Sequence, residues 1–214
     1  MDFLNSIILL TNFIIVPGIT YGSQLALGAI GVTLIYGVLR FANFAYGDLM
    51  AFGTMIVILV TWFLQSKGIT FGLLPTALLA LPVGILLTIV VSLFFDKTVF
   101  EYYRNKKSDP VTFIVVSLGI MFVLNAVVRI IIGPNDINFM DGHKFIMKAR
   151  EFKQMTGLNE GLALKSTQVI TLITTIITCS ILFYFLNKTK TGKSMRAYSN
   201  NEDLALLSGI DPKK

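Results

Sequence analysis

Long apolar blocks constrain this chain more than any other feature. A helix needs about 20 apolar residues to cross the bilayer core, and five blocks of roughly that length carry charges only near their ends. They are residues 18–39, 48–64, 72–95, 111–132 and 167–186. A membrane β-barrel would show shorter segments of alternating hydrophobicity, which are absent. Because lipid cannot satisfy exposed backbone groups, the sequence predicts an all-α polytopic transmembrane helical bundle.

The start of the chain leaves the number of spans open. Residues 3–16 are also apolar and end at Pro17-Gly18. A secretory signal would begin with basic residues, whereas the only early charge is Asp2. We therefore predict a retained lead-in helix that either crosses the membrane separately or continues into the first span, giving six spans or five.

The distribution of the few charged residues predicts which ends of the spans face the cytoplasm. Charged residues make up only 14% of the chain, and the net charge is +6. The basic residues lie in short segments beside the spans, where an excess of Lys and Arg marks the cytoplasmic side. This pattern predicts that Arg40, residues 96–107 (taken as a loop) and the tail are cytoplasmic. Lys67 and the long loop 133–166 are then outside, and no nucleic-acid partner is indicated.

Residues 40–48, RFANFAYGD, interrupt two apolar blocks. Asn43 and Asp48 are residue types that start helices, and Gly47 allows a sharp turn. One interpretation is a tight turn between helices with a capped helix start. The other is a broken or re-entrant element on a translocation path, where helix N-termini present free N–H groups.

A stripe of small residues, Gly18, Gly22 and Ala26, precedes this segment on one helix face. Such stripes allow close helix packing in lipid. Gln24 differs, because a polar amide within a span is expected to face a partner or a pore.

The tail contains a second informative segment. Asn201 is a good N-cap, the acids Glu202 and Asp203 follow it, and Gly209 is placed to end a helix. A helix this short needs a surface to dock on. That surface is either its own membrane domain or a partner protein, in which case the helix couples the two.

Enzyme chemistry finds no support in the sequence. Gly192-Lys193-Ser194 looks like the end of a phosphate-binding loop, but the first glycine of that motif is replaced by Asn187. The single histidine, His143, falls in the outer loop, and no cluster has metal-ligand spacing. We expect neither metal nor cofactor, and we predict that the protein is not an enzyme.

Three segments in order resemble the LivH-type permeases of bacterial branched-chain amino acid ABC importers. They are GITYGS at 18–23 leading into Tyr36-Gly37, NFAYGD at 43–48, and TGKSMRA at 191–197 followed by LSGI at 207–210. The resemblance covers the whole chain. It implies a permease domain over residues 1–214, with spans within 18–187 and a cytoplasmic coupling segment at 188–214.

The resemblance also implies function and partners. The chain would move branched-chain amino acids, or related solutes such as urea or amides, across the bacterial inner membrane. It would assemble with ATP-binding cassette ATPases, a second related permease and a periplasmic solute-binding protein. The implied path residues are Gln24, Asn43, Phe44, Ala45, Tyr46, Gly47 and Asp48. The implied ATPase-coupling residues are Gly192, Arg196, Ala197, Leu207, Gly209 and Ile210.

Two departures from the family pattern qualify these expectations. Tyr46 stands where the family often has histidine, so no titratable imidazole is available there. Family members continue beyond the coupling segment with further spans, so we expect a fragment or the product of a split gene. The alternatives are a stand-alone secondary transporter or channel, which needs ionisable groups within its spans, and a regulatory membrane module.

Overall fold

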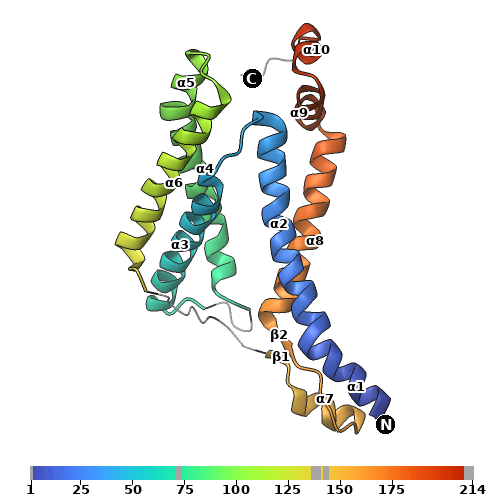
Figure 1. Cartoon of the computed structure of the whole chain (residues 1–214). Helices are drawn as coiled ribbons and strands as arrows, with labels where there is room; N and C mark the ends of the chain where they lie inside the picture. The colour runs from blue at the N-terminus through green and yellow to red at the C-terminus, as the bar shows by residue number, and fades with distance from the viewer. Residues whose placement is uncertain (1, 71–73, 136–140, 142–144, 210–214) are drawn as a thin grey trace. The chain divides into compact units, whose positions relative to one another are not determined.

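The computed structural model describes residues 2–70, 74–135, 141 and 145–209. The chain forms two compact units: unit 1 comprises residues 1–39 and 144–214, and unit 2 comprises residues 40–143 (Figure 1). Within the described residues, five helical segments are long and apolar enough to cross a membrane, which confirms the predicted polytopic all-α fold. They are Phe3–Leu39, Ala45–Ser66, Ala77–Asn105, Pro110–Ile132 and Ser166–Lys188.

The lead-in segment of unit 1 is continuous with the first span. Helix α1 (Asp2–Leu10) passes through the π-helical turn η1 (Thr11–Ile15) into α2 (Val16–Leu39). In η1 the Val16 N–H bonds the Thr11 carbonyl, five residues back. Pro17 follows directly, and its ring lacks an N–H and crowds the preceding turn. The described chain therefore has five candidate spans, and the first, of 37 residues, is about 55 Å long and exceeds the bilayer core.

The loop predicted to lie outside contains regular structure that the sequence did not reveal. Strands β1 (Phe145–Met147) and β2 (Leu164–Lys165) pair antiparallel around helix α7 (Ala149–Thr156). The Asn12 side chain, in η1, bonds this loop twice: its amide nitrogen donates to the Gly161 carbonyl at 2.6 Å, and its oxygen accepts from the Ala163 N–H at 3.0 Å. One side chain thus ties the loop to the first helix.

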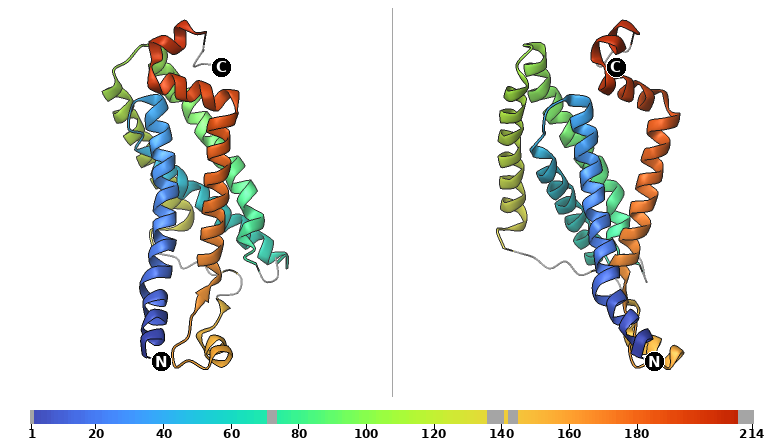
Figure 2. Two further views of the ribbon diagram at one scale, coloured as in Figure 1. Left: turned by 90° about the vertical axis from the view of Figure 1, so that its right-hand side faces the viewer. Right: turned by 45° about the vertical axis from the view of Figure 1, so that its right-hand side comes forward.

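Helix α8 (Ser166–Lys188) lies beside α2 within unit 1, as Figure 2 shows. It is followed by two shorter helices, α9 (Lys190–Asn200) and α10 (Glu202–Leu207). The sequence had predicted α10 but not α9.

Unit 2 contains the other three candidate spans. They are α3 (Ala45–Ser66), then α4 (Ala77–Phe95), which continues through the π-helical turn η2 (Asp96–Phe100) into α5 (Glu101–Asn105), and finally α6 (Pro110–Ile132). The prediction of a loop over residues 96–105 is wrong. The π turn contains one residue more than an α-helical turn, and the helix continues through it to Asn105.

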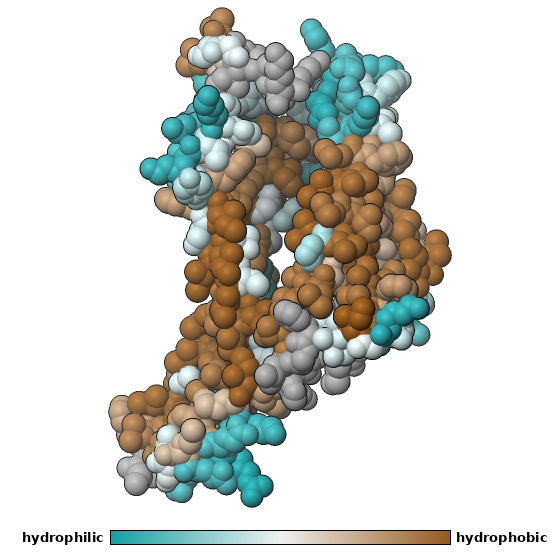
Figure 3. Space-filling view, turned by 180° about the vertical axis from the view of Figure 1, so that it is seen from behind, coloured by the Kyte–Doolittle hydropathy of each residue, from teal (hydrophilic) through white to brown (hydrophobic). Residues whose placement is uncertain are grey.

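Helices α4 and α6 both pack on α3. Glycines permit the approach to α4: a Cβ atom on Gly53 would lie 2.7 Å from the Thr88 hydroxyl, and one on Gly84 would lie 3.3 Å from the Gly53 carbonyl. On the other side, a cluster of buried side chains joins α3 to α6 and the end of the α4 segment. Its members are Phe41, Ala45, Phe100, Ile120 and Leu124. Outside such contacts, apolar side chains cover the long helices, and polar ones gather near helix ends (Figure 3).

Candidate functional site

The Asn43–Asp48 segment is held in unit 2 by buried apolar side chains at its start. Phe41 is 7% exposed, and its ring stacks on Phe113 at 5.2 Å between centroids and contacts Phe100 at 5.8 Å. Ala45, the first residue of α3, is only 1% exposed. The segment is therefore fixed on both sides of Asn43 rather than free to move as an open loop.

Polar contacts complete the start of α3. The Asn43 side-chain oxygen accepts from the Ala45 N–H at 3.1 Å, which forms an Asx turn just before α3. The Phe44 N–H donates to the Ser117 hydroxyl on α6, also at 3.1 Å. The Tyr46 N–H bonds the Asn43 carbonyl at 3.4 Å. Helix α3 thus begins at Ala45, two residues after Asn43. These three N–H groups are occupied and cannot bind a solute.

The contacts with α6 set the depth of this segment. Ser117 lies seven residues and Asn125 fifteen residues after Pro110, the first residue of α6. These positions are about 10 and 22 Å along a helix of about 34 Å. Because Phe44 and Asp48 bond these two residues, α3 begins about a third of the way along α6. A turn at the membrane surface would instead meet an end of α6.

Asp48 is joined to α6 through one amide. The Asn125 side-chain nitrogen donates to Asp48 Oδ1 at 2.9 Å, and its oxygen accepts from Arg129 Nε at 2.8 Å. The sequence analysis singled out Asp48 but missed Asn125 and the role of Arg129. The signal was present: the two polar residues are four positions apart, on one face of an otherwise apolar helix.

The other predicted path residues differ in their surroundings. Tyr46 is half-buried, and Gly47 is exposed in unit 2. Gln24 belongs to unit 1, where it is exposed on α2 and makes no hydrogen bond to any described residue. The structure thus brings together residues 43–48, whereas Gln24 belongs to the other unit.

The predicted coupling segment begins at a tightly packed junction. The Thr189 hydroxyl accepts from the Gly192 N–H at 3.0 Å and so caps α9. Gly192 is buried, and a Cβ atom there would lie 2.6 Å from the Leu186 Cα atom. Only glycine lets α9 turn so closely over the end of α8.

Arg196 and Ala197 lie further along α9. Arg196 donates to the Asn187 side-chain oxygen at 2.9 Å, which holds α9 against the end of α8. Arg196 also lines a groove of about 440 Å³ between α2, α8 and α9, whose other lining side chains include Leu182 and Phe185. Ala197 is half-buried and accepts the Asn201 N–H at 3.1 Å.

Helix α10 presents apolar side chains outward. The Asn201 side chain accepts from the Leu204 N–H at 3.1 Å, and Gly209 has a φ of +80°, so the predicted N-cap and helix end are both confirmed. Ala205 is buried, whereas Leu204 and Leu207 are 61% and 84% exposed. Ile210 lies outside the described residues.

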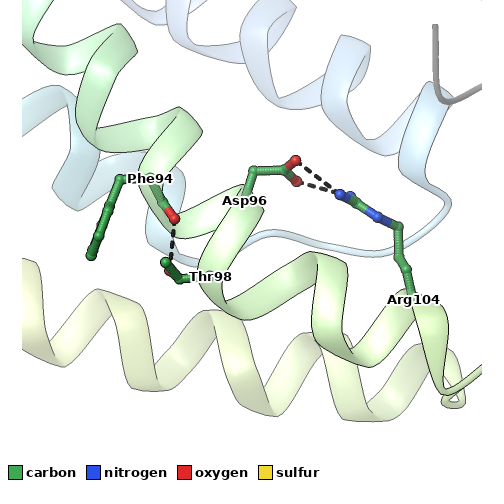
Figure 4. A network of polar contacts seen from close by, with 4 residues as sticks. All are labelled: Phe94, Asp96, Thr98 and Arg104. Carbon is green, nitrogen blue, oxygen red and sulfur yellow. Dashed lines mark hydrogen bonds and ion pairs between the residues drawn. The ribbon is translucent and has the colours of Figure 1, made fainter.

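The predicted cytoplasmic end of unit 2 carries a second polar cluster (Figure 4). Arg104 donates to both carboxylate oxygens of Asp96 at 2.8 Å across η2. The Thr98 hydroxyl donates to the Phe94 carbonyl at 2.6 Å. Beyond the span, a hydrogen bond to Tyr102 raises the pKa of the Lys106 ammonium above its ordinary value. These exposed contacts neutralise and extend a helix end and form no enclosed site.

Comparison with known proteins identifies the family. Residues 14–214 match the family described as the permease component of the branched-chain amino acid transport system. The chain belongs to this permease family. The family is one of transport permease components, and among the described residues no group of three or more His, Cys, Asp or Glu side chains could hold a metal ion.

The chain shares modest sequence identity with known members of the family. It is 24% identical over 201 residues to the high-affinity branched-chain amino acid transport system permease protein LivH of Escherichia coli K12, covering 91% of this chain and 60% of LivH. It is 23% identical over 206 residues to the high-affinity branched-chain amino acid transport system permease protein BraD of Pseudomonas aeruginosa, covering 92% of this chain and 62% of BraD. The chain thus spans about three-fifths of these relatives. No solved structure matches it.

Proposed function

We propose that this chain is a membrane permease component of an ATP-driven importer that moves branched-chain amino acids, or related small polar solutes such as urea or amides, across the bacterial inner membrane. The observation that carries the proposal is the match to the permease family over residues 14–214. The five candidate spans supply the membrane domain that such a component needs.

In this proposal residues 43–48 lie on the translocation path, and Gln24 contributes an amide from α2. Their support is that α3 begins about a third of the way along α6 and not at its end. Irregular backbone at that depth is tolerated only where protein or a water-filled cavity covers it.

In this proposal α9 and α10 couple the membrane spans to the ATPase. Gly192 and Arg196 hold α9 against the end of α8. The other residues proposed for coupling are Ala197, Leu207, Gly209 and Ile210, which follow in the sequence. Exposed Leu204 and Leu207 provide an apolar surface for an ATPase subunit. ATP hydrolysis in that partner, not in this chain, would move α10 and switch the spans between outward-open and inward-open states. A second related permease and a solute-binding protein complete the assembly.

A stand-alone secondary transporter has one observation in its favour. Such proteins place ionisable groups within their spans, and Asp48, in the first turn of α3, bonds Asn125 within α6. The family match favours the importer.

The substitution Gly209→Leu tests the coupling role. A leucine at φ +80° costs about 1–2 kcal/mol locally and should displace the end of α10. Uptake should be abolished while the amount of protein in the membrane stays unchanged. Gly68→Leu is the matched control, because Gly68 has a φ of +74° after α3 and no described neighbour within 4 Å of a Cβ atom. Unchanged uptake in the Gly209 variant would remove the coupling assignment.

A further inference from the structure

Asp48 and Arg129 are the only acid and the only base within the bounds of helices α3, α4 and α6. They have opposite charge and come from different helices, yet they meet at the same side chain. Ionisable residues within spans are rare and generally mark a functional site. Their convergence on Asn125 therefore calls for an explanation beyond helix packing.

The amide keeps the two charges apart. Asn125 uses its nitrogen for Asp48 and its oxygen for Arg129 Nε. Two hydrogen bonds and the width of an amide limit the separation of Asp48 Oδ1 and Arg129 Nε to about 8 Å. A direct ion pair would satisfy both charges by itself, but none joins these two residues.

Both charged groups retain hydrogen-bonding capacity. A carboxylate offers about four acceptor sites and a guanidinium five donors. Among the residues that the structure describes, Asp48 Oδ2 and both Nη groups of Arg129 make no hydrogen bond. Asp48, in the first turn of α3, is only partly buried, and Arg129, in the last turn of α6, is exposed. A polar solute can therefore reach both charged groups.

We propose that Asp48, Asn125 and Arg129 form a subsite for the charged headgroup of a zwitterionic amino acid. The solute's ammonium donates to Asp48, and its carboxylate accepts from the Nη groups of Arg129. The two charges of an α-amino acid are about 3 Å apart, and with a hydrogen bond of about 2.8 Å on each side they bridge about 8 Å. The inference rests on the proposed function and specifies that the translocation path selects a solute with both an ammonium and a carboxylate group.

Saturation-transfer NMR on the full chain in nanodiscs tests the subsite without ATP. The probes are leucine, leucinamide, which lacks the carboxylate, and 4-methylpentanoate, which lacks the ammonium. With the unaltered protein, the saturation-transfer signal of leucine should be about tenfold stronger than the signal of either analogue. Equal signals for the three probes, or no leucine contact, would overturn the proposal without any substitution being made.

Two substitutions then assign the charges. Asp48→Asn should weaken leucine binding about tenfold and leave 4-methylpentanoate unchanged, whereas Arg129→Gln should weaken leucine and leave leucinamide unchanged. Asp96→Asn and Arg104→Gln, which neutralise the exposed pair of the same unit, are matched controls and should not alter any signal. Equal weakening of all three probes in the site variants would mean a structural role only.

Two further comparisons distinguish the bound solute from a bound lipid, and the subsite from the importer function. Nanodiscs of phosphatidylcholine and of phosphatidylglycerol should give the same leucine signal. A signal lost in phosphatidylcholine alone would identify the zwitterionic lipid headgroup as the occupant and overturn the solute assignment. Absence of ATP-driven uptake together with charge-selective leucine contact would reject the importer but keep the subsite.

Discussion

Unit 2 buries parts of three spanning helices against one another, whereas the two spanning helices of unit 1 bury almost nothing. In the most apolar windows of α3, α4 and α6, 17%, 11% and 17% of the residues are buried, against 6% and 0% in the first span and α8. Unit 2 joins charged side chains of α3 and α6 through Asn125, while unit 1 has polar contacts at Asn12, in η1, and around Arg196. The difference indicates that unit 2 is internally packed and that the helix faces of unit 1 are available to lipid or to other protein.

The largest effect should come from the packed core of unit 2. Phe41→Ala removes a ring that contacts Phe100 and Phe113, and should lower the free energy of unfolding by about 3–5 kcal/mol. The control, Phe183→Ala, truncates a ring that is 72% exposed on α8 and should cost less than about 1 kcal/mol. Denaturant unfolding in detergent, followed by circular dichroism, measures both. Equal losses would contradict the contrast between the units.

The junction of α8 and α9 is the exception in unit 1, because it is tightly packed. Gly192→Ala should destabilise the protein by about 1–3 kcal/mol, since the added methyl group meets the α8 backbone. Gly119→Ala, within α6 and with no described neighbour within 4 Å of its Cβ position, should instead be neutral or stabilising by up to about 1 kcal/mol. A stabilising Gly192 variant would show that α9 does not pack as described.

Ser117 tests the polar contact that holds the start of α3. Ser117→Ala leaves the Phe44 N–H without its acceptor at a fully buried position, which should cost about 1–3 kcal/mol. Ser23→Ala, at an exposed position on α2 of unit 1, should change stability by no more than about 0.5 kcal/mol. The same unfolding experiment compares them. A silent Ser117 variant would mean that water replaces the lost hydroxyl.

The smallest effect is expected at the exposed Asp96–Arg104 pair. The Asp96 side chain is 48% exposed and the Arg104 side chain 41% exposed, so Asp96→Asn should cost no more than about 1 kcal/mol at low salt. The loss should shrink further as ionic strength rises, because salt screens exposed charges. Unfolding at two salt concentrations measures this. A large loss that salt does not change would indicate a buried, functional pair.

The sequence predicted the spans well because their apolar length is a local property. It also predicted the cap at Asn201 and the helix end at Gly209, where one residue type decides the backbone. It missed the helix over 96–105, whose polar residues follow an apolar block and look like a loop. It also missed α9, whose composition is polar and whose helix depends on the close approach at Gly192.

The candidate site was only partly predictable for a different reason. Asn43 and Asp48 stand out because they interrupt apolar sequence. The partners that hold this segment, Ser117 for the Phe44 N–H and Asn125 for Asp48, lie more than 70 positions away on α6. Spacing within one helix shows that Asn125 and Arg129 share a face. It does not show which helix meets that face, and this depends on the packing of α3 against α6.

The most direct test of the account is solute uptake by the protein assembled with its transport partners in sealed vesicles. Radiolabelled leucine uptake is measured with ATP, after ATP depletion, and after the proton gradient is dissipated. The account predicts uptake that requires ATP and persists without the proton gradient. Uptake that survives ATP depletion but collapses with the proton gradient would contradict it and identify a secondary transporter.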